Sequence, residues 1–326
     1  MTRRSVFWNT HSRFVLGLFL TVSAPLHAAF DDNNWGARAV GMGGAFTAVA
    51  DDASAPMYNP AGLSQLQWNE LTAMYSRLLT GLTLYSGGDN TGGDISTLDE
   101  SYLAFASKPN KFGSFALSWA NFNTTHLYRE DTFTLSYSRY LDDLISLPGN
   151  SLSFGANVKY LHRSIALDAF TVSDPVFAGG TTKSAAAVDV GVLYKPEDGP
   201  LNGWRLGFSA LNVNQPDVGF GARDNVPLEY RVGVAYQSRL HPWIVPDVDY
   251  VRSAGVNDIE AGCESWLFKD TIGLRAGVNR DEASAGLSYY QGVGKGFGFR
   301  LDYGFTIPFY IEGTDGNQRL QASLYF

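Results

Sequence analysis

Charged residues of both signs recur at alternating positions within apolar segments from residue 159 onward. They are Lys159, Asp189, Arg205, Glu229, Arg231, Glu264, Arg275, Arg300 and Asp302. Side chains of opposite charge on neighbouring strands can neutralise one another as ion pairs. A row of such groups can also line a pore and select its solutes. We favour the first interpretation, a polar network inside a barrel, and keep the pore lining as the alternative.

Patterns typical of catalysis or cofactor binding are weak. Gly41-Met-Gly43-Gly44 begins like a dinucleotide-binding fingerprint, but Phe46 takes the place of the third glycine and no βαβ pattern surrounds it. His162 and Ser164 could belong to a hydrolase triad, yet a histidine at a strand end is more often a polar residue at a membrane rim. The single cysteine, Cys263, excludes an internal disulfide. We therefore expect no enzymatic activity, no cofactor and no metal site.

Residues 1–29 have the anatomy of a secretory signal peptide. Arginines precede the apolar run Phe14–Val22, and small residues end the stretch at Ala28 and Ala29. Cleavage after either alanine fits. Removing residues 1–29 takes away three arginines and no acidic residue, so the formal charge falls from −8 to −11. An acidic exported chain with few basic clusters argues against a nucleic-acid partner.

From about residue 69 onward, apolar and polar residues alternate with the period of a β-strand. In residues 151–163, for example, Leu152, Phe154 and Val158 share one face, while serine, asparagine and lysine share the other. The alternating segments commonly run for about nine to thirteen residues, the length that a tilted strand needs to cross a bilayer. Tyrosines recur near the segment ends, as in an interfacial girdle. These features favour a transmembrane β-barrel over a soluble lipocalin-like barrel.

The segments predict an all-β chain of about fourteen antiparallel strands. We place the strands near 69–86, 101–107, 112–122, 130–140, 150–163, 184–195, 203–213, 227–239, 244–253, 256–268, 270–280, 283–291, 296–306 and 318–326. With both termini in the periplasm, the longest connectors (87–100, 164–183, 214–226 and 307–317) all fall on the outer side, where bacterial barrels carry their long loops. The connector 141–149 is the exception.

The last strand ends in an aromatic residue. Leu320, Ala322, Leu324 and Phe326 alternate along it. An alternating terminal strand that ends in phenylalanine is the pattern read by the outer-membrane barrel assembly machinery. Together with the signal peptide, it predicts insertion into the lipid of a bacterial outer membrane.

Residues 30–68 lack the strand period and precede the barrel of residues 69–326. The segment is rich in small residues that permit close backbone packing, and it carries acidic residues and a turn signal. We interpret it as a plug or hatch inside the barrel, with its gating positions at Gly41, Gly43, Gly44, Asp51, Asp52, Asn59, Pro60 and Ala61.

The run Gly36–Leu63 resembles the N-terminal signature of the FadL-type superfamily of outer-membrane barrels. The stretches Tyr128–Tyr137 and Gly262–Trp266, followed by Leu274-Arg-Ala-Gly277, place the resemblance closest to the PorV/PorQ (UPF0164) branch. The resemblance implies about fourteen strands with the N-terminal segment in the lumen. FadL-type barrels take up fatty acids or aromatic hydrocarbons, and the PorV branch carries secretion cargo. This chain is shorter than typical FadL-type transporters, so their extended ligand-binding loops are in question.

From these features we expect an outer-membrane barrel that binds or transports hydrophobic small molecules resembling fatty acids or hydrocarbons. A secretion-associated barrel that binds polypeptide cargo is the alternative, and a general diffusion porin comes third. The expected partners are outer-membrane lipid, the barrel assembly machinery, and either a hydrophobic ligand or a secreted protein.

Overall fold

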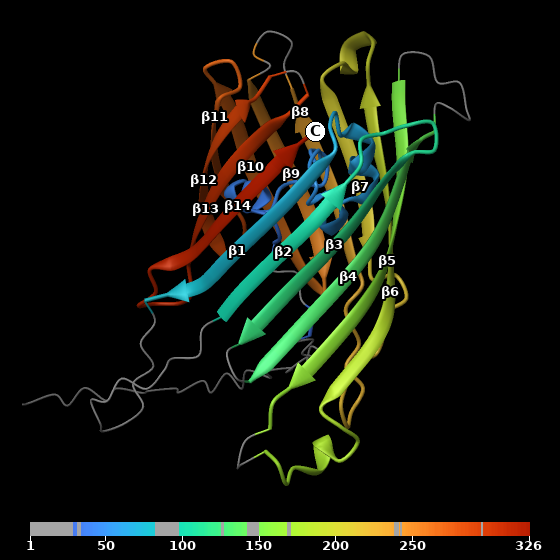
Figure 1. Ribbon diagram of the computed structural model, residues 1–326, viewed down its shortest axis with the longest axis vertical. Coiled ribbons are helices and arrows are strands. Elements are labelled where there is room, and N and C mark those ends of the chain that lie inside the picture. The colour runs from blue at the N-terminus through green and yellow to red at the C-terminus, as the bar shows by residue number, and fades with distance from the viewer. Residues whose placement is uncertain are drawn as a thin grey trace, which may run out of the picture.

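The computed structural model describes residues 29–30, 34–81, 98–124, 127–141, 150–167, 171–237, 241, 243–294 and 296–326. These residues form a closed barrel of fourteen antiparallel strands, in which each strand pairs with the next and β1 pairs with β14 (Figure 1). The strands are β1 (Glu70–Thr80), β2 (Leu98–Ala106), β3 (Ser114–Thr124), β4 (Tyr128–Tyr140), β5 (Asn150–Ile165), β6 (Thr182–Pro196), β7 (Trp204–Leu211), β8 (Glu229–Tyr236), β9 (Ile244–Ser253), β10 (Val256–Leu267), β11 (Ile272–Val278), β12 (Glu282–Gly292), β13 (Gly298–Pro308) and β14 (Gly316–Tyr325).

The fold class and each of the fourteen predicted strands are confirmed. The segment 244–253 was predicted with the bounds of β9, and most other ends agree within a few residues. The first strand was predicted over 69–86 as one strand with a possible break; β1 covers Glu70–Thr80, and residues 82–86 lie outside the described residues. β7 ends at Leu211 because Asn212 takes a left-handed backbone with a φ of 56°, and its amide N–H turns to the Asp189 carboxylate. Residues 1–28 and 142–149 lie outside the described residues, so the signal peptide and most of the connector 141–149 stay predictions.

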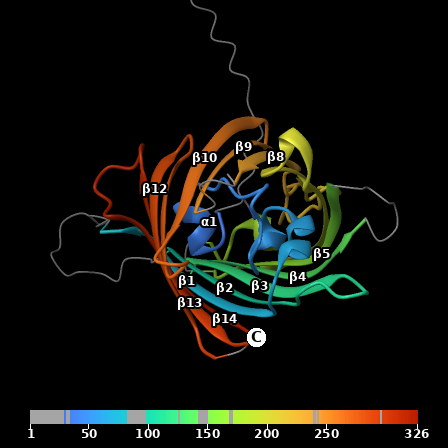
Figure 2. The ribbon, with the colours of Figure 1, turned by 90° about the horizontal axis from the view of Figure 1, so that it is seen from above.

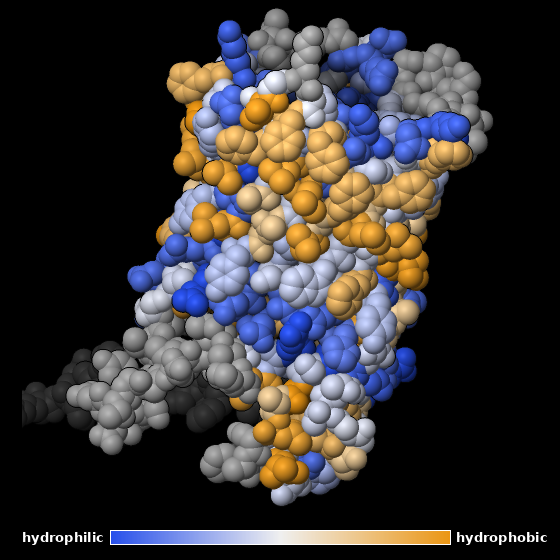
Figure 3. Space-filling view, viewed as in Figure 1, coloured by the Kyte–Doolittle hydropathy of each residue, from blue (hydrophilic) through white to orange (hydrophobic). Residues whose placement is uncertain are grey.

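Alternation along each strand separates a polar lumen from an apolar exterior. On β5, Ser153 and Asn157 are buried, whereas Val158 and Tyr160 are more than half exposed on the outside. Figure 3 shows the resulting apolar band across the upper half of the barrel. No helix in the described part of the chain has the length and apolarity needed to cross a bilayer.

The N-terminal segment, residues 34–68, lies inside the ring of strands (Figure 2). It contains a one-turn helix, α1 (Ala37–Gly41), and two short 3-10 helices, η1 (Ala55–Met57) and η2 (Pro60–Gln65). α1 contacts β11, β12, β13 and β14, and η2 contacts β3, β4, β5 and β6. Nearly all of its residues up to Leu66 are buried, so the protein's core lies between this segment and the wall.

The two ends of the barrel differ. Glu70 and Phe326 mark one end, where the turns are short, and we call it the periplasmic end because bacterial barrels place their short turns there. The other end, at the bottom of Figure 1, carries the longer connectors and is called the outer end. A 3-10 helix, η3 (Pro175–Phe177), lies in the β5–β6 connector at the outer end, and η4 (Gly199–Leu201) lies in a periplasmic turn.

Candidate functional site between the N-terminal segment and the wall

The N-terminal segment rests on glycines of the wall, which we call the glycine seat. One glycine comes from each of β5, β6, β7, β8, β10, β11, β12 and β13: Gly155, Gly191, Gly207, Gly233, Gly262, Gly277, Gly286 and Gly304. They form cross-strand pairs, Gly155 with Gly191, Gly207 with Gly233, Gly262 with Gly277 and Gly286 with Gly304. A Cβ at Gly277 would lie 2.1 Å from the Met42 carbonyl carbon. The absence of side chains therefore lets two backbones touch.

The predicted hatch residues lie inside the lumen, and several of them touch the wall. Gly41 faces the wall, where its Cβ would come within 3.0 Å of the Gly286 Cα. Gly43 and Gly44, with φ values of 71° and 88°, turn the chain after α1 in a conformation that favours glycine. The remaining predicted hatch residues bond or pack inside the lumen: Asp51, Asp52, Asn59, Pro60 and Ala61.

Asn59 organises the segment at η2. Its Oδ1 accepts the Ala61 N–H at 3.1 Å and so caps the helix. Its Nδ2 donates to the carbonyl oxygens of Thr47 at 3.0 Å and of Val192 on β6 at 3.1 Å. Pro60 and Ala61 then lie over Gly155, and the Ser153 hydroxyl donates to the Ala61 carbonyl. One side chain thus joins the cap, the segment and the wall.

Arg38 is the centre of the first ion-pair cluster. Its guanidinium donates twice to the Glu264 carboxylate, with both distances 2.7 Å, and also bonds Asp51 at 2.5 Å. Glu264 accepts a further bond of 2.5 Å from Arg275. Arg38, Glu264 and Arg275 are all at least nine-tenths buried. Charge-assisted, bidentate contacts of this kind are the strong class of hydrogen bond.

A second cluster surrounds Arg231. The guanidinium pairs with Glu229 at 2.9 Å and with Glu260, and it donates to the Gly44 carbonyl at 3.0 Å. On the neighbouring strand, Asp249 accepts the backbone N–H groups of Phe46 and Thr47 at 2.9 and 2.8 Å. Wall charges therefore fix the backbone of the N-terminal segment directly.

The other predicted network residues also find partners. Lys159 bonds Asp189 at 2.8 Å, Arg205 reaches Asp51 at 3.3 Å, and Arg300 joins Asp302 at 2.7 Å and Asp52 at 3.2 Å. Sequence reasoning missed Arg38 and Asp249. Arg38 is the only basic residue of the N-terminal segment, and Asp249 alternates with valine in Asp247-Val-Asp249. Both patterns could have indicated a charged side chain inside the lumen.

Asp52 lies outside the strands and is held by two guanidinium groups. Burial raises the pKa of the Asp52 carboxyl, but Arg38 and Arg300 outweigh burial and hold that pKa below its usual value. Ser54 adds bonds from its backbone N–H and hydroxyl at 2.9 and 2.6 Å. A carboxyl with a lowered folded-state pKa contributes stability above its unfolded pKa of about 3.9 and loses it as the pH falls toward the folded value.

We expect Asp52→Asn to lower the thermal midpoint of unfolding at neutral pH, and the difference from the wild type to shrink as the pH falls from about 5 to about 2. The reason is that protonation of Asp52 in the wild type removes the charge that the variant already lacks. Thermal unfolding in detergent, followed by circular dichroism across that pH range, measures it. A difference that stays constant at acidic pH would contradict the assignment.

Arg163 holds the β7–β8 connector over the outer end. Its guanidinium bonds Asp224 at 2.7 Å and lies 5.2 Å from the ring centroids of Tyr128 and Phe220. It also donates to the Val218 carbonyl. The connector is thereby joined to β5.

Arg163→Ala is expected to expose the connector to chymotrypsin at Phe220. Loss of the ion pair and the cation–π contacts removes on the order of 1 kcal/mol of local stability, which raises the cleavage rate roughly fivefold. Arg223→Ala is the matched control, since Arg223 lies on the same connector and is exposed. Gel electrophoresis measures the rate of cleavage. Equal rates for the two variants would argue against this role for Arg163.

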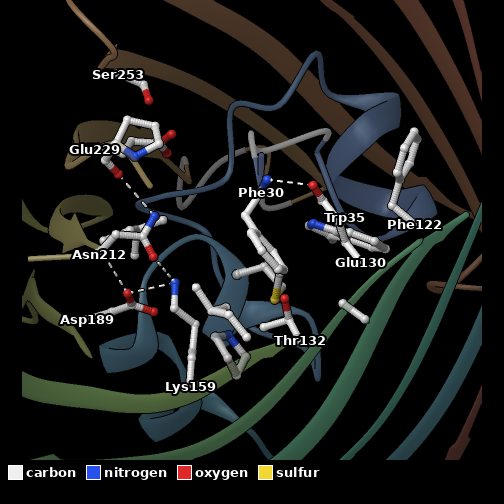
Figure 4. Close-up of a pocket in the computed structure, with 16 residues that line it drawn as sticks. Phe30, Trp35, Phe122, Glu130, Thr132, Lys159, Asp189, Asn212, Glu229 and Ser253 are labelled. Carbon is white, nitrogen blue, oxygen red and sulfur yellow. Dashed lines mark hydrogen bonds and ion pairs between the residues drawn. The ribbon is translucent and has the colours of Figure 1, made fainter. Parts of the chain in front are cut away.

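A small cavity of about 60 Å³ lies between the N-terminal segment and the outer end. Phe30, Trp35, Met57 and Phe122 contribute its apolar lining, and the Phe30 N–H donates to Glu130 at 2.9 Å (Figure 4). A space of this size holds a few water molecules, whereas a benzene-sized ligand needs roughly 150 Å³.

Larger hollows lie on either side of the N-terminal segment. The outer one, of about 480 Å³, is lined largely by charged and amide side chains, among them Arg231, Glu260 and Arg319. The periplasmic one, of about 400 Å³, combines charged groups with Trp68 and Trp266. In the described residues, no three histidine, cysteine or acidic side chains gather as metal ligands would.

The predicted barrel-assembly residues lie on β14 and at its end. Leu320, Leu324 and Phe326 are exposed on the outside, and Ala322 shares their face. Phe326 exchanges two backbone hydrogen bonds with Asn69, both 3.0 Å, and its ring stacks on Phe105. These contacts close the barrel at its periplasmic end. The assembly role stays a prediction.

Solved structures with a similar fold are barrels of the FadL type. The toluene transporter TodX of Pseudomonas putida aligns with a TM-score of 0.57 and 13% identity over 91% of this chain and 97% of that chain. The Ralstonia pickettii toluene transporter TbuX gives 0.54 and 11% over 90% and 97%, and a Pseudomonas aeruginosa FadL homologue gives 0.52 and 13% over 88% and 97%. Such low identities show the fold alone, and at that level the predicted similarity to FadL-type barrels is confirmed.

No curated protein sequence matches the chain. One family model does, over residues 120–309, and its description is the type IX secretion system membrane protein PorP/SprF. The matched stretch runs from β3 to the end of β13 and carries every residue of the glycine seat. Because it spans more than half of the sequence, the chain belongs to the PorP/SprF family of type IX secretion system membrane proteins.

Proposed function

We propose that the protein is a closed outer-membrane barrel of a type IX secretion apparatus that binds exported polypeptide at its surface and does not conduct small solutes. The observation that carries the proposal is the glycine seat, in which wall and N-terminal segment meet backbone to backbone. A removable gate needs a weakly held contact. Here buried ion pairs through Arg38 and Arg231 hold the contact as well.

The family match supports the secretion role, and the lining of the hollows supports the absence of a hydrocarbon path. Apolar cargo binds in pockets that are mostly apolar with few polar groups. The two larger hollows instead present guanidinium and carboxylate groups, such as Arg231 and Glu260 on the outer side and Arg38 and Glu264 on the periplasmic side.

Deletion of the protein from its bacterium tests the proposal. We expect a defined set of exported polypeptides to disappear from the cell surface, measured by quantitative mass spectrometry of surface-labelled protein, and to return with the wild-type chain. The purified wild-type barrel should show little conductance in a planar bilayer. An unchanged set of surface polypeptides would overturn the proposal.

Binding of a hydrophobic small molecule is the second candidate, favoured by the fold shared with toluene transporters and by the aromatic lining of the small cavity. Because that cavity has about 60 Å³, lining side chains have to move before a hydrocarbon-sized ligand can enter. Mass spectrometry of lipid or hydrocarbon that co-purifies with the protein separates this candidate from the first. A general diffusion porin would show high conductance in the wild type.

Several finer assignments belong to the same proposal. They are cleavage of the leader after Ala28 or Ala29, residence in the outer membrane, a plugging role for the N-terminal segment, a position near the PorV/PorQ branch and the lack of enzymatic activity. N-terminal sequencing of the mature protein and fractionation of membranes test the first two.

A further inference from the structure

One strand of the wall has an unpaired edge at the outer end. β6 pairs with β5 along Asn150–Ser164, but β7 pairs with β6 only from Val190 to Tyr194. β7 ends at Leu211, whereas β6 continues to Thr182. Figure 1 shows β5 and β6 reaching beyond the other strands. Strand edges present a row of backbone donors and acceptors to any chain that lies alongside them.

The direction of the backbone groups follows from two contacts. The Ile165 N–H donates to the Thr181 carbonyl, so odd-numbered residues here direct their N–H and C=O groups toward β5. Val188 and Ala186 point the other way, because both bond the side-chain amide of Asn214. The next residues on that side are Ser184 and Thr182. Among the described residues, no backbone group bonds either of them on the β7 side.

Asn214 shows what this edge recognises. Its Oδ1 accepts the Val188 N–H at 3.0 Å, and its Nδ2 donates to the Ala186 carbonyl at 2.8 Å. A primary amide that accepts from one residue and donates to the residue two positions before it reproduces the N–H and C=O that one residue of a neighbouring strand presents to the same side. The pairing pattern of β6 therefore continues past β7, with a side chain standing in for backbone, and ends at Ala186.

Space for a further chain lies beside the free edge. A hollow of about 390 Å³ is lined by Thr182 and Lys183 of β6, by Pro175, Val176, Gly179 and Gly180 of the β5–β6 connector, and by Asp217 and residues 219–223 of the β7–β8 connector. Phe177 and Phe220 contact each other across the two connectors, with ring centroids 5.8 Å apart. We call the β5–β6 and β7–β8 connectors together the outer lobe. On this lobe, Val172 and Val176 are 62% and 49% exposed. An extended chain on this edge would meet these apolar groups.

The outer lobe lies farther toward the outer end than the apolar band of the barrel. Figure 3 shows a hydrophilic zone between the band and a separate apolar patch at the lower end of the view. Toward the outer ends of β5 and β6, His162 and Ser184 bond each other at 2.9 Å. Lipid that covers the band does not reach the patch, so the patch is free to contact another molecule.

We propose that the edge of β6 at Thr182–Ser184 binds an extended segment of an exported polypeptide as an added β-strand. The inference rests on the proposed function and names the partner's conformation: backbone bonds supply the affinity, and apolar side chains of the segment contact Val172, Val176 and Phe220. Displacement of the Asn214 side chain would lengthen the edge by the Ala186 carbonyl and the Val188 N–H, while the Val188 carbonyl stays bonded to the Val213 N–H.

Photo-crosslinking in living cells tests the proposal. p-Benzoylphenylalanine in place of Thr182 is expected to form an adduct with an exported polypeptide, whose contacted residues mass spectrometry then maps to one extended stretch. The matched control has the same label in place of Arg129, which is exposed at the outer end of β4 but paired with strands on both sides. No adduct at Thr182 above the Arg129 level would overturn the proposal.

Ser184→Pro sharpens the test. Proline removes the one N–H that Ser184 directs away from β5 and leaves the β5 ladder intact. We expect the Thr182 adduct to be lost with Ser184→Pro and kept with Ser184→Ala, which removes only the hydroxyl. If the Thr182 adduct still forms in the Ser184→Pro variant, the inference is wrong. If deletion of the protein changes the surface polypeptides while Ser184→Pro does not, the secretion role stands and the edge is the wrong site.

Discussion

Replacement of Gly277 by valine is expected to convert a closed barrel into a conducting one. The new Cβ would lie 2.1 Å from the Met42 carbonyl carbon and 2.3 Å from the Gly43 nitrogen, so the clash is with backbone and no rotamer relieves it. Overpacking of this kind costs about 1–3 kcal/mol. A penalty of that size on the seated state raises the population with the N-terminal segment displaced by roughly 5- to 150-fold. Single-channel recording in planar bilayers measures the change.

The matched control for this experiment is Gly179→Val. Gly179 lies in the β5–β6 connector, and a Cβ added there would have no other atom within 4 Å. Gly262→Val is an independent second test, because its Cβ would lie 2.2 Å from the Met42 carbonyl oxygen. Gly277→Val changes a lumenal contact and leaves the pairing with β10 and β12 in place. Folding of each variant is checked by heat-modifiable migration on gels. If a folded Gly277→Val barrel conducts no more than Gly179→Val, the glycine seat is not what keeps the barrel closed.

The strands could be predicted because their signal is local. Along β5, apolar residues at every second position indicate the face that contacts lipid, and this pattern can be read without knowing the neighbouring strands. The predicted inward face of residues 151–163 is the buried face of β5 for the same reason. Ends were less certain where a single backbone angle decides them, as at Asn212.

The contacts of the candidate site could be predicted only in part. Glu264 and Arg275 are cross-strand partners, so their pairing follows once the register of β10 and β11 is known. Arg38 reaches the same carboxylate from 226 positions away, and no spacing rule links such residues. The glycine seat was missed because a glycine in a strand usually signals a weak strand or a bulge. Its meaning depends on the path of another segment inside the barrel.

Glu264→Ala is expected to be the most destabilising change in the ion-pair clusters. The carboxylate serves two buried guanidinium groups at once, with three bonds of 2.5–2.7 Å to Arg38 and Arg275. Removal of one partner from a buried ion pair leaves charge without compensation in a low-dielectric site, which costs about 3–5 kcal/mol. Urea denaturation in detergent, followed by tryptophan fluorescence, measures the free energy of unfolding.

Arg280→Ala is the control that separates the effect of burial from the effect of losing an ion pair. Arg280 and Asp281 also form an ion pair, at 3.8 Å, but both side chains are more than half exposed, so its loss should cost no more than about 1 kcal/mol. If Glu264→Ala costs no more than Arg280→Ala, the carboxylate does not hold the N-terminal segment to the wall. The segment would then depend on the glycine seat alone.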